Sequence, residues 1–303
     1  MAEKREKFLG TLYSFPMGLW ITVFFVLPLL IIFTYSFLKK GLYGGVEWSF
    51  SLSAYKDMLN PAFLKVLWRT VWISVLATGI CMLISIPCGY AMARSKHQTL
   101  FLFLIMIPFW TNSLIRIYAW INILSTEGFL NNFLISTGLT GSPLPLIYNA
   151  FSVVLVLVYM YIPFAILPIF TTIDKFDFSL LDAGRDLGAT KLESIVKIML
   201  PNIKSGLSTA LVFTFIPIFG AYTVPLLVGG MDSTMIGNII VDQIQKTRNW
   251  PLASAFSVIL TVISMVGVLW MMRSGHSEKM KKKVLNREDE LMELARKKRG
   301  GKA

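Results

Sequence analysis

The residues best suited to act on another molecule lie in one polar stretch, 179–201, between two long apolar runs. Ser179 followed by Asp182 is a pattern that caps the start of a helix, and Gly188 suits the left-handed position that ends one. Pro201 then closes the stretch. We therefore expect one helix, a glycine junction and a second helix, which is a shape suited to docking on another molecule.

The second of these helices has its own start signal, because Thr190 and Glu193 have the spacing of a capping box. One side of this helix is apolar and carries Leu192, Ile195, Val196 and Met199. The other side is mainly charged and carries Lys191, Glu193 and Lys197. Such an amphipathic pattern is also typical of a solvated loop that merely joins two membrane spans, and this alternative stays open from local pattern alone.

The same stretch resembles the cytoplasmic signature of permeases of ATP-binding-cassette importers, which reads Glu-Ala-Ala, three residues, Gly, nine residues, then Ile-x-Leu-Pro. Every spacing is kept, by Asp182, Ala183, Gly184, Gly188, Ile198, Leu200 and Pro201. Asp182 stands in place of Glu and Gly184 in place of the second Ala, which changes no charge sign and adds no bulk. The resemblance implies a coupling helix pair in a groove of the ATPase subunit, with contact centred on 182–189, including Leu187 and Ala189.

Composition places the chain in a membrane. Its 303 residues are 55% hydrophobic and only 15% charged, which excludes an ordinary soluble domain. Several apolar runs reach the roughly 20 residues needed to cross a hydrocarbon core. We expect an all-α protein with an N-terminal arm 1–14, a basic tail 273–303, and six spans at about 15–38, 68–93, 99–123, 150–172, 205–228 and 251–272. The resemblance implies the type I importer permease fold for these spans.

The distribution of Lys and Arg predicts the orientation. The arm, the 94–98 turn, the segment 173–204 that contains the coupling stretch, and the tail hold 3, 2, 5 and 11 of them, whereas the three opposite segments hold 7 together and one lies inside a span. Both termini and the stretch 179–201 are therefore expected in the cytoplasm, under a bacterial plasma membrane. This orientation explains the net charge of +12 without nucleic-acid binding. The tail is either a solvated helix or a contact for anionic lipid head groups.

The residue types that catalysis and metal binding need are scattered. Cys81 and Cys88 share a helix face inside one apolar run and are expected to be packing residues, while His97 and His276 lie alone. The chain has no Gly-x-x-x-x-Gly-Lys-Ser/Thr loop for nucleotide phosphates, and none of its 17 Asp and Glu falls within a predicted span. We expect no metal, no cofactor on this chain and no proton-coupled pumping, so ATP and Mg²⁺ belong to a partner ATPase.

The one charge inside a predicted span is Arg116. Because a charge in lipid is costly, this side chain either faces the bundle interior, pairs with a partner or extends to the outer surface. Asn112 is four residues before Arg116 and two helical turns before Trp120, a spacing that predicts a polar and aromatic stripe on one side of the helix. Trp110 and Tyr118 are eight residues apart, so on an ideal helix they would be offset by about 80° and border one groove.

The run 108–118, Pro-Phe-Trp-Thr-Asn-Ser-Leu-Ile-Arg-Ile-Tyr, resembles the third-span signature of permeases of spermidine and putrescine importers, and the similarity extends over 16–272. The resemblance implies a polyamine cargo, a second permease subunit, two copies of a cytoplasmic ATPase and an extracytoplasmic binding protein. Aromatic rings attract cations by about 0.5–2 kcal/mol each, which suits such a cargo. The candidate pathway residues are Trp110, Asn112, Arg116, Tyr118, Tyr159, Tyr161 and Tyr222. Each aromatic residue among them is otherwise a packing residue or an interface anchor.

Of three rival functions, the sequence leaves one fully open. The same machine could carry sulfate, iron or another small solute, because coupling chemistry is shared across cargoes. A membrane-embedded enzyme would need convergent His, Cys or acidic residues at membrane depth, which the spans do not provide. A passive channel would leave the stretch 179–201 unexplained.

Overall fold

The computed structural model describes residues 15–269, so the predicted arm 1–14, the tail 273–303 and the last residues of the sixth span lie outside the described part. Four helices in this part are long and apolar enough to cross a membrane, namely Phe15–Tyr35, Pro61–Ala93, Ala150–Ile173 and Trp250–Leu269. Two bent helix pairs bring the number to six if each pair is one span. The predicted all-α membrane architecture is confirmed.

The chain divides into two compact units, and the first combines residues up to Thr70 with Thr234–Ile263. Its elements are the helix Phe15–Tyr35, which contains η1 (Thr22–Val26) and α2 (Leu27–Tyr35), then β1 (Leu38–Lys40), β2 (Val46–Phe50), α3 (Ser53–Met58), the start of α4 (Pro61–Ala93), α14 (Ile236–Gln245) and most of the helix Trp250–Leu269. The antiparallel strand pair β1–β2 lies in the segment between the first two predicted spans.

A small core holds this first unit together. Met58 of α3 and Ile236 of α14 are buried with Leu252 and Phe256 of the last helix. The buried Thr70 hydroxyl accepts a hydrogen bond from the Ile236 amide at 2.8 Å, which satisfies a free N–H at the start of α14. The unit thus joins segments that are more than 150 residues apart in sequence.

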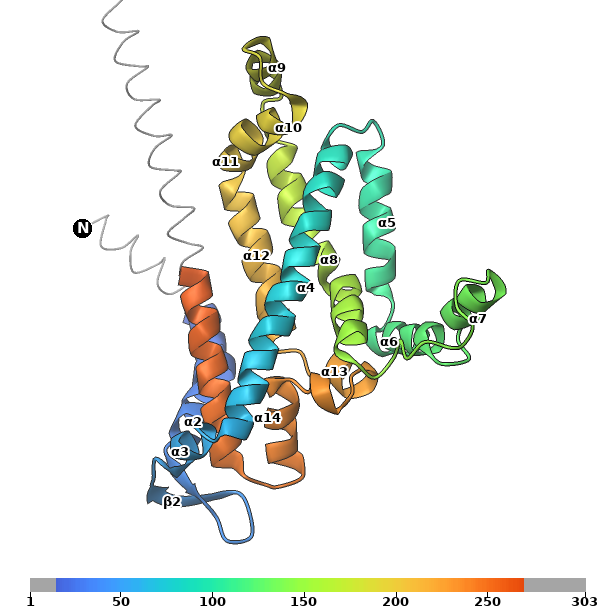
Figure 1. The fold of residues 1–303 in the computed structure, drawn as a ribbon. Coiled ribbons are helices and arrows are strands. Elements are labelled where there is room, and N and C mark those ends of the chain that lie inside the picture. Colours follow the sequence, from blue (N-terminus) through green and yellow to red (C-terminus); the bar gives the residue numbers. More distant parts are fainter. Residues whose placement is uncertain (1–14, 270–303) are drawn as a thin grey trace, which may run out of the picture. The chain divides into compact units, whose positions relative to one another are not determined.

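The second unit comprises Val71–Ser233 and, among the described residues, 264–269, and it contains the remaining helices. They are the rest of α4, α5 (Gln98–Trp110), α6 (Ser113–Leu124), α7 (Phe129–Ser136), α8 (Ala150–Ile173), α9 (Ser179–Asp186), α10 (Lys191–Ser194), η2 (Ile195–Met199), α11 (Leu200–Asn202), α12 (Lys204–Phe219), α13 (Thr223–Val228) and η3 (Met231–Ser233). Helices α8 and α12 pack along each other (Figure 1). A side chain at Gly206 of α12 would overlap Thr172 of α8, so this close approach requires glycine.

The third span is broken, contrary to the single helix predicted over 99–123. Helix α5 ends at Trp110, and the next helical segment, Ser113–Ser136, runs at 91° to it (Figure 1). The 13 residues of α5 rise only about 20 Å at about 1.5 Å each, less than a hydrocarbon core of about 30 Å. Trp110 and Tyr118 therefore belong to different helices, and the predicted offset of about 80° on one ideal helix is wrong.

Two polar side chains, those of Thr111 and Asn112, mark the break. The Thr111 hydroxyl donates to the Pro108 carbonyl at 2.7 Å, which closes the end of α5. Asn112 then caps α6, because its side-chain oxygen accepts from the Leu114 amide at 2.8 Å. Thr111 and Asn112 lie inside the single helix that the sequence predicted. In the structure they are the stop signal of one helix and the start signal of the next.

Two further boundaries differ from the prediction. The second span begins at Pro61 rather than at 68, since α4 is a single helix of 33 residues. The predicted fifth span, 205–228, is α12 followed by the short α13, with a break over Gly220–Tyr222. Gly220 ends α12 and Tyr222 precedes α13, so the chain changes direction before it reaches the predicted end of the span.

Candidate functional site

The stretch 179–201 folds as the predicted pair of helices, and Figure 1 shows α9 and α10 beyond one end of α8 and α12, with α13 at the other end. Helix α9 ends in a Schellman motif, in which the Gly188 amide donates to the Arg185 carbonyl at 2.8 Å and the Ala189 amide to the Gly184 carbonyl at 3.1 Å. Gly188 has a φ of +88°, the predicted left-handed conformation. A Cβ there would meet nothing within 4 Å, so conformation rather than space requires glycine.

The start of α9 differs from the prediction. The helix begins at Ser179, but the side chain that satisfies its first amide is Asp177, whose carboxylate accepts from the Ser179 N–H at 3.0 Å. Hydrogen bonds from the Ser179 hydroxyl and amide lower the pKa of Asp177. Asp182 lies in the first turn and pairs with Arg185 at 3.3 Å instead of taking part in a cap. The cue that was missed is an Asp two residues before the helix, which forms a local turn.

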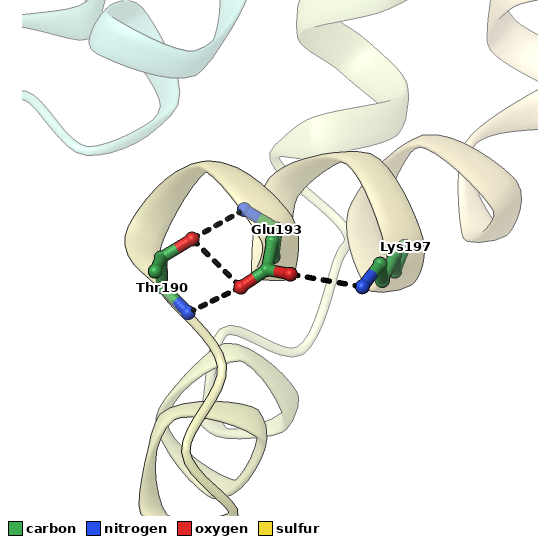
Figure 2. A network of polar contacts seen from close by, with 3 residues as sticks. All are labelled: Thr190, Glu193 and Lys197. Atoms are coloured by element: carbon green, nitrogen blue, oxygen red, sulfur yellow. Dashed lines mark hydrogen bonds and ion pairs between the residues drawn. The ribbon is translucent and has the colours of Figure 1, made fainter.

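The capping box at the start of α10 is confirmed, and Figure 2 shows its contacts. The Glu193 amide donates to the Thr190 hydroxyl oxygen at 3.2 Å, while the Thr190 amide donates to the Glu193 carboxylate at 3.0 Å. Lys197 extends the network with an ion pair to the same carboxylate at 2.9 Å. These bonds, the one from the Thr190 amide first, lower the pKa of Glu193 to about 2.

Pro201 does not end the second helix as predicted. The helix continues through η2 and α11 to Asn202, and the chain then bends by 76° into α12 around Ile203. Pro201 lies in α11, directly after the π-helical residues of η2, and so inside this continuous helical run. The coupling pair is therefore continuous with α12 through one sharp bend.

The apolar side of the second helix divides into an outer and an inner part. Leu192 is 74% exposed and Val196 51% exposed, whereas Met199 is fully buried. Leu187, beside the glycine junction, is 90% exposed. Large apolar side chains this exposed, on a segment that is otherwise charged, are typical of a surface that a partner covers.

The inner part holds the two helices of the pair together. Gly184 of α9 is buried, and a Cβ at this position would overlap the Cδ1 of Ile198. Leu181, which the sequence reading did not single out, is only 1% exposed and anchors the same face of α9. Among the other signature residues, those exposed are Asp182, Ala183, Gly188 and Pro201, and those half-buried are Ala189, Ile198 and Leu200.

A second feature is a cavity of about 230 Å³ between α6 and α8. It is lined by Thr111, Ile115, Arg116, Ala119, Trp120, Ile123 and Tyr159. The rings of Trp120 and Tyr159 meet edge to face with centroids 5.4 Å apart. The cavity thus brings together Arg116 and Tyr159 of the predicted pathway residues, together with Trp120.

Arg116 lies against an aromatic ring. Its guanidinium carbon is 5.3 Å from the Phe109 ring centroid, and its buried Nε has no hydrogen-bond partner within residues 15–269. Tyr161 of α8 stacks obliquely with Phe164, whose ring also meets Phe109 edge to face at 5.1 Å. The guanidinium is thus packed among aromatic rings beside the cavity.

The other candidate pathway residues occupy separate places. Trp110 is exposed at the end of α5, Asn112 caps α6, and Tyr118 lies on the exposed face of α6. Tyr222 is exposed at the break before α13. The structure therefore does not gather the predicted set into one site.

Metal ligands and reactive thiols do not converge in the described part of the chain. Residues 15–269 contain no group of three or more His, Cys, Asp and Glu side chains that could hold a metal ion. Cys81 is buried in α4, where its thiol contacts the Val158 carbonyl of α8 at 3.7 Å. Cys88 is half-buried on the same helix. The contact of Cys81 with α8 is helix packing, as the sequence reading expected.

Known proteins are similar to this chain in sequence and in fold. The chain is 35% identical to the spermidine/putrescine transport system permease protein PotB of Escherichia coli strain K12, over 88% of this chain and 96% of that protein. It is 34% identical to the protein of the same name in Haemophilus influenzae, over 90% and 93%. Its fold matches, with a TM-score of 0.71 and 15% identity, a chain of a bacterial ABC transporter involved in the import of the acidic polysaccharide alginate, over 90% and 96%.

A family match covers more than half of the sequence. Residues 82–274 match the family described as binding-protein-dependent transport system inner membrane component. The matched range includes the coupling pair, the cavity beside Arg116 and the broken third span. This protein is therefore a multi-pass membrane subunit, and it belongs to the family of binding-protein-dependent transport system inner membrane components.

Proposed function

We propose that this chain is the permease subunit of a polyamine importer and forms half of the pathway for spermidine and putrescine. The observation that carries the cargo is the identity of 34–35%, over about nine tenths of the chain, to proteins named as spermidine/putrescine permeases. The type of transporter is inferred from the family and the fold, and the type of solute is inferred from the names of the relatives.

The energy for transport comes from other subunits. Two copies of a cytoplasmic ATPase bind ATP and Mg²⁺ and dock on the coupling pair, whose exposed Leu187, Leu192 and Val196 are the surface to be covered. A second, similar permease completes the pathway, and an extracytoplasmic binding protein delivers the cargo. Both termini and the coupling pair then lie on the cytoplasmic side of a bacterial plasma membrane, as the distribution of Lys and Arg favours.

The cargo path uses weak aromatic contacts. Tyr159 and the neighbouring Trp120 present rings at the cavity, and each ring attracts a primary or secondary ammonium by about 0.5–2 kcal/mol. Arg116 in the same wall repels a polycation, so the cavity holds such a cargo only loosely. Loose, serial contacts allow release, which is what a pathway subunit needs. Trp110, Asn112, Tyr118, Tyr161 and Tyr222 remain proposed pathway positions.

One observation favours a second candidate cargo. The buried Nε of Arg116 faces no acceptor within the described residues, and a guanidinium is the side chain best suited to bind an oxyanion. An importer of sulfate or another small anion would use this group directly. The two cargoes make opposite demands on Arg116, so one experiment separates them.

The test is uptake of labelled spermidine, putrescine and sulfate by cells that carry the complete transporter, with and without this chain. We expect spermidine and putrescine uptake to be lost without the chain and sulfate uptake to be the same with and without it. Tyr159→Leu should lower polyamine uptake several-fold, whereas the matched control Tyr159→Phe, which keeps the ring, should transport nearly normally. Chain-dependent sulfate uptake that Arg116→Gln abolishes would replace the polyamine proposal with the anion one.

A further inference from the structure

A group of contacts joins the turn between α4 and α5 to the segment that leads from α8 into α9. The side-chain amide of Gln98 donates to the Asp174 carboxylate at 3.1 Å and to the Ala93 carbonyl at 3.0 Å. The guanidinium carbon of Arg94 lies 5.5 Å from the centre of the Phe178 ring. Residues about 80 positions apart in sequence are thus held side by side next to the coupling pair.

Two aromatic rings flank the exposed Arg94 side chain. Arg94 donates a hydrogen bond to the Tyr90 hydroxyl at 3.1 Å, and the Tyr90 and Phe178 rings meet edge to face with centroids 6.0 Å apart. Phe176 adds another edge-to-face contact to Phe178 at 5.6 Å. The hydrogen bond with Tyr90 raises the pKa of Arg94, and the nearby Asp182 carboxylate of α9 adds a smaller contribution. The guanidinium therefore remains charged and is attracted toward the coupling pair.

The turn itself is firmly attached to α8. A Cβ at Gly89 of α4 would lie 3.0 Å from the Ile169 side chain and 3.3 Å from the backbone nitrogen of Phe170. Met92 is buried together with Ile166 and Phe170, and apolar side chains of α5 pack on this cluster. Because no free space separates α4 from α8 here, the end of this helical hairpin cannot slide without moving α8.

We propose that Arg94, Gln98, Asp174 and Phe178, which we call the latch, transmit movement of the coupling pair to α4 and α5. This inference rests on the proposed function as an ATPase-driven importer. Along the chain, the coupling pair is joined to the spans at the end of α8 and at the bend around Ile203 before α12. The latch adds a third attachment, so one displacement at the ATPase surface reaches four helices. Its members are positioning residues, because they touch neither cargo nor nucleotide.

The chain offers matched variants for the test. Phe178→Leu removes the ring and keeps apolar volume, while Phe178→Tyr keeps the ring. Arg94→Gln removes the charge, and Arg94→Lys retains it. Each variant is assembled into the complete transporter in vesicles, with measurements of bound ATPase, cargo moved per ATP hydrolysed, and stimulation of ATP hydrolysis by the binding protein.

We expect Phe178→Leu and Arg94→Gln each to lower cargo per ATP and the stimulation by about two- to fivefold, with a normal amount of bound ATPase. Phe178→Tyr should behave like the unaltered chain and Arg94→Lys should keep most of its activity. The double variant Arg94→Gln with Phe178→Leu should be no worse than the more impaired single variant, because both changes remove the same contact.

The latch is refuted if both single variants keep the unaltered ratios, if their losses multiply in the double variant, or if lost transport simply follows lost ATPase. Failure of the proposed polyamine cargo would give a different result from failure of the latch. The unaltered transporter would then move no polyamine, while stimulation of ATP hydrolysis by its binding protein would still distinguish Phe178→Leu from Phe178→Tyr.

Discussion

At the scale of single residues, the junction of the coupling pair depends on one backbone angle. The φ of +88° at Gly188 lies in a region that side chains with a Cβ avoid, although the space around it is empty. Gly184, four residues earlier, has the opposite reason to be glycine, because its backbone is helical and its surroundings are filled by Ile198. Glycine is thus required at 188 by the backbone angle and at 184 by the lack of space for a side chain.

Replacement of Gly188 tests the first of these demands. Gly188→Val forces a β-branched residue toward positive φ, which costs about 1–2 kcal/mol or tilts α9 relative to α10. Uptake driven by ATP should fall strongly although the subunit still inserts in the membrane. Gly188→Asn is the matched control, since Asn tolerates the left-handed region, and it should retain much more uptake. Equal, normal uptake in both variants would show that the angle does not matter for coupling.

At the scale of elements, the parts that local chemistry determines were predictable from the sequence. The capping box of Thr190 and Glu193 and the left-handed Gly188 act within four residues of themselves, so their spacing sufficed. The break in the third span is also local, and Thr111-Asn112 was its signal. It was missed because the hydropathy of the flanking segments favours one continuous span.

The cavity and the latch could not be predicted in the same way. The cavity requires Trp120 of α6 to meet Tyr159 of α8, and the latch requires Gln98 to reach Asp174. Both contacts depend on how the helices pack, and the periodicity of a single helix contains no information on its neighbour. Aromatic and basic residues in these positions were consequently indistinguishable from anchors or solvated charges.

The capping box gives a prediction with a defined pH range. The pKa of Glu193 falls to about 2 in the folded state from its ordinary value of 4.5, so its contribution is fully present above 4.5 and is lost as the pH falls through about 2. ATPase co-purification should therefore show no Glu193-dependent change between about pH 5 and pH 8. Glu193→Ala should reduce co-purification equally across that range, and Glu193→Gln less, because its amide oxygen still accepts from the Thr190 amide. A Glu193→Ala defect that disappears at one end of the range would contradict the assignment.

At the scale of the whole molecule, the chain is a pathway subunit of an importer rather than an enzyme, as its family and relatives show. Four of its six predicted spans correspond to long helices, whereas the third is broken by a 91° bend after α5 and the fifth consists of α12 followed by α13. One consequence is that α5 cannot by itself place residues on both sides of the membrane. The sidedness of the connecting segments then becomes a direct test of the arrangement.

A cysteine-accessibility scan supplies that test, with the buried Cys81 and half-buried Cys88 as the native background. Single cysteines within 94–98 and 179–201 should react with a membrane-impermeant reagent only from the cytoplasmic side. Cysteines near Glu47, Glu127 and Asp232 should react only from outside. Exchange of any position between the two groups would overturn the proposed orientation.

The helix Phe15–Tyr35 buries none of its most apolar window against the described part of the chain, and it precedes the range 82–274 that matches the family. Among the described residues, packing therefore places little demand on the shape of the side chains in this window, and length and hydropathy are the properties that a membrane span requires of them. Leu, Ile, Val and Phe can replace one another there by neutral drift, whereas Gly206 and Thr172 constrain each other's evolution because each fills the other's space. Over long divergence, we expect the side chains of this window to keep their hydropathy while their identities change.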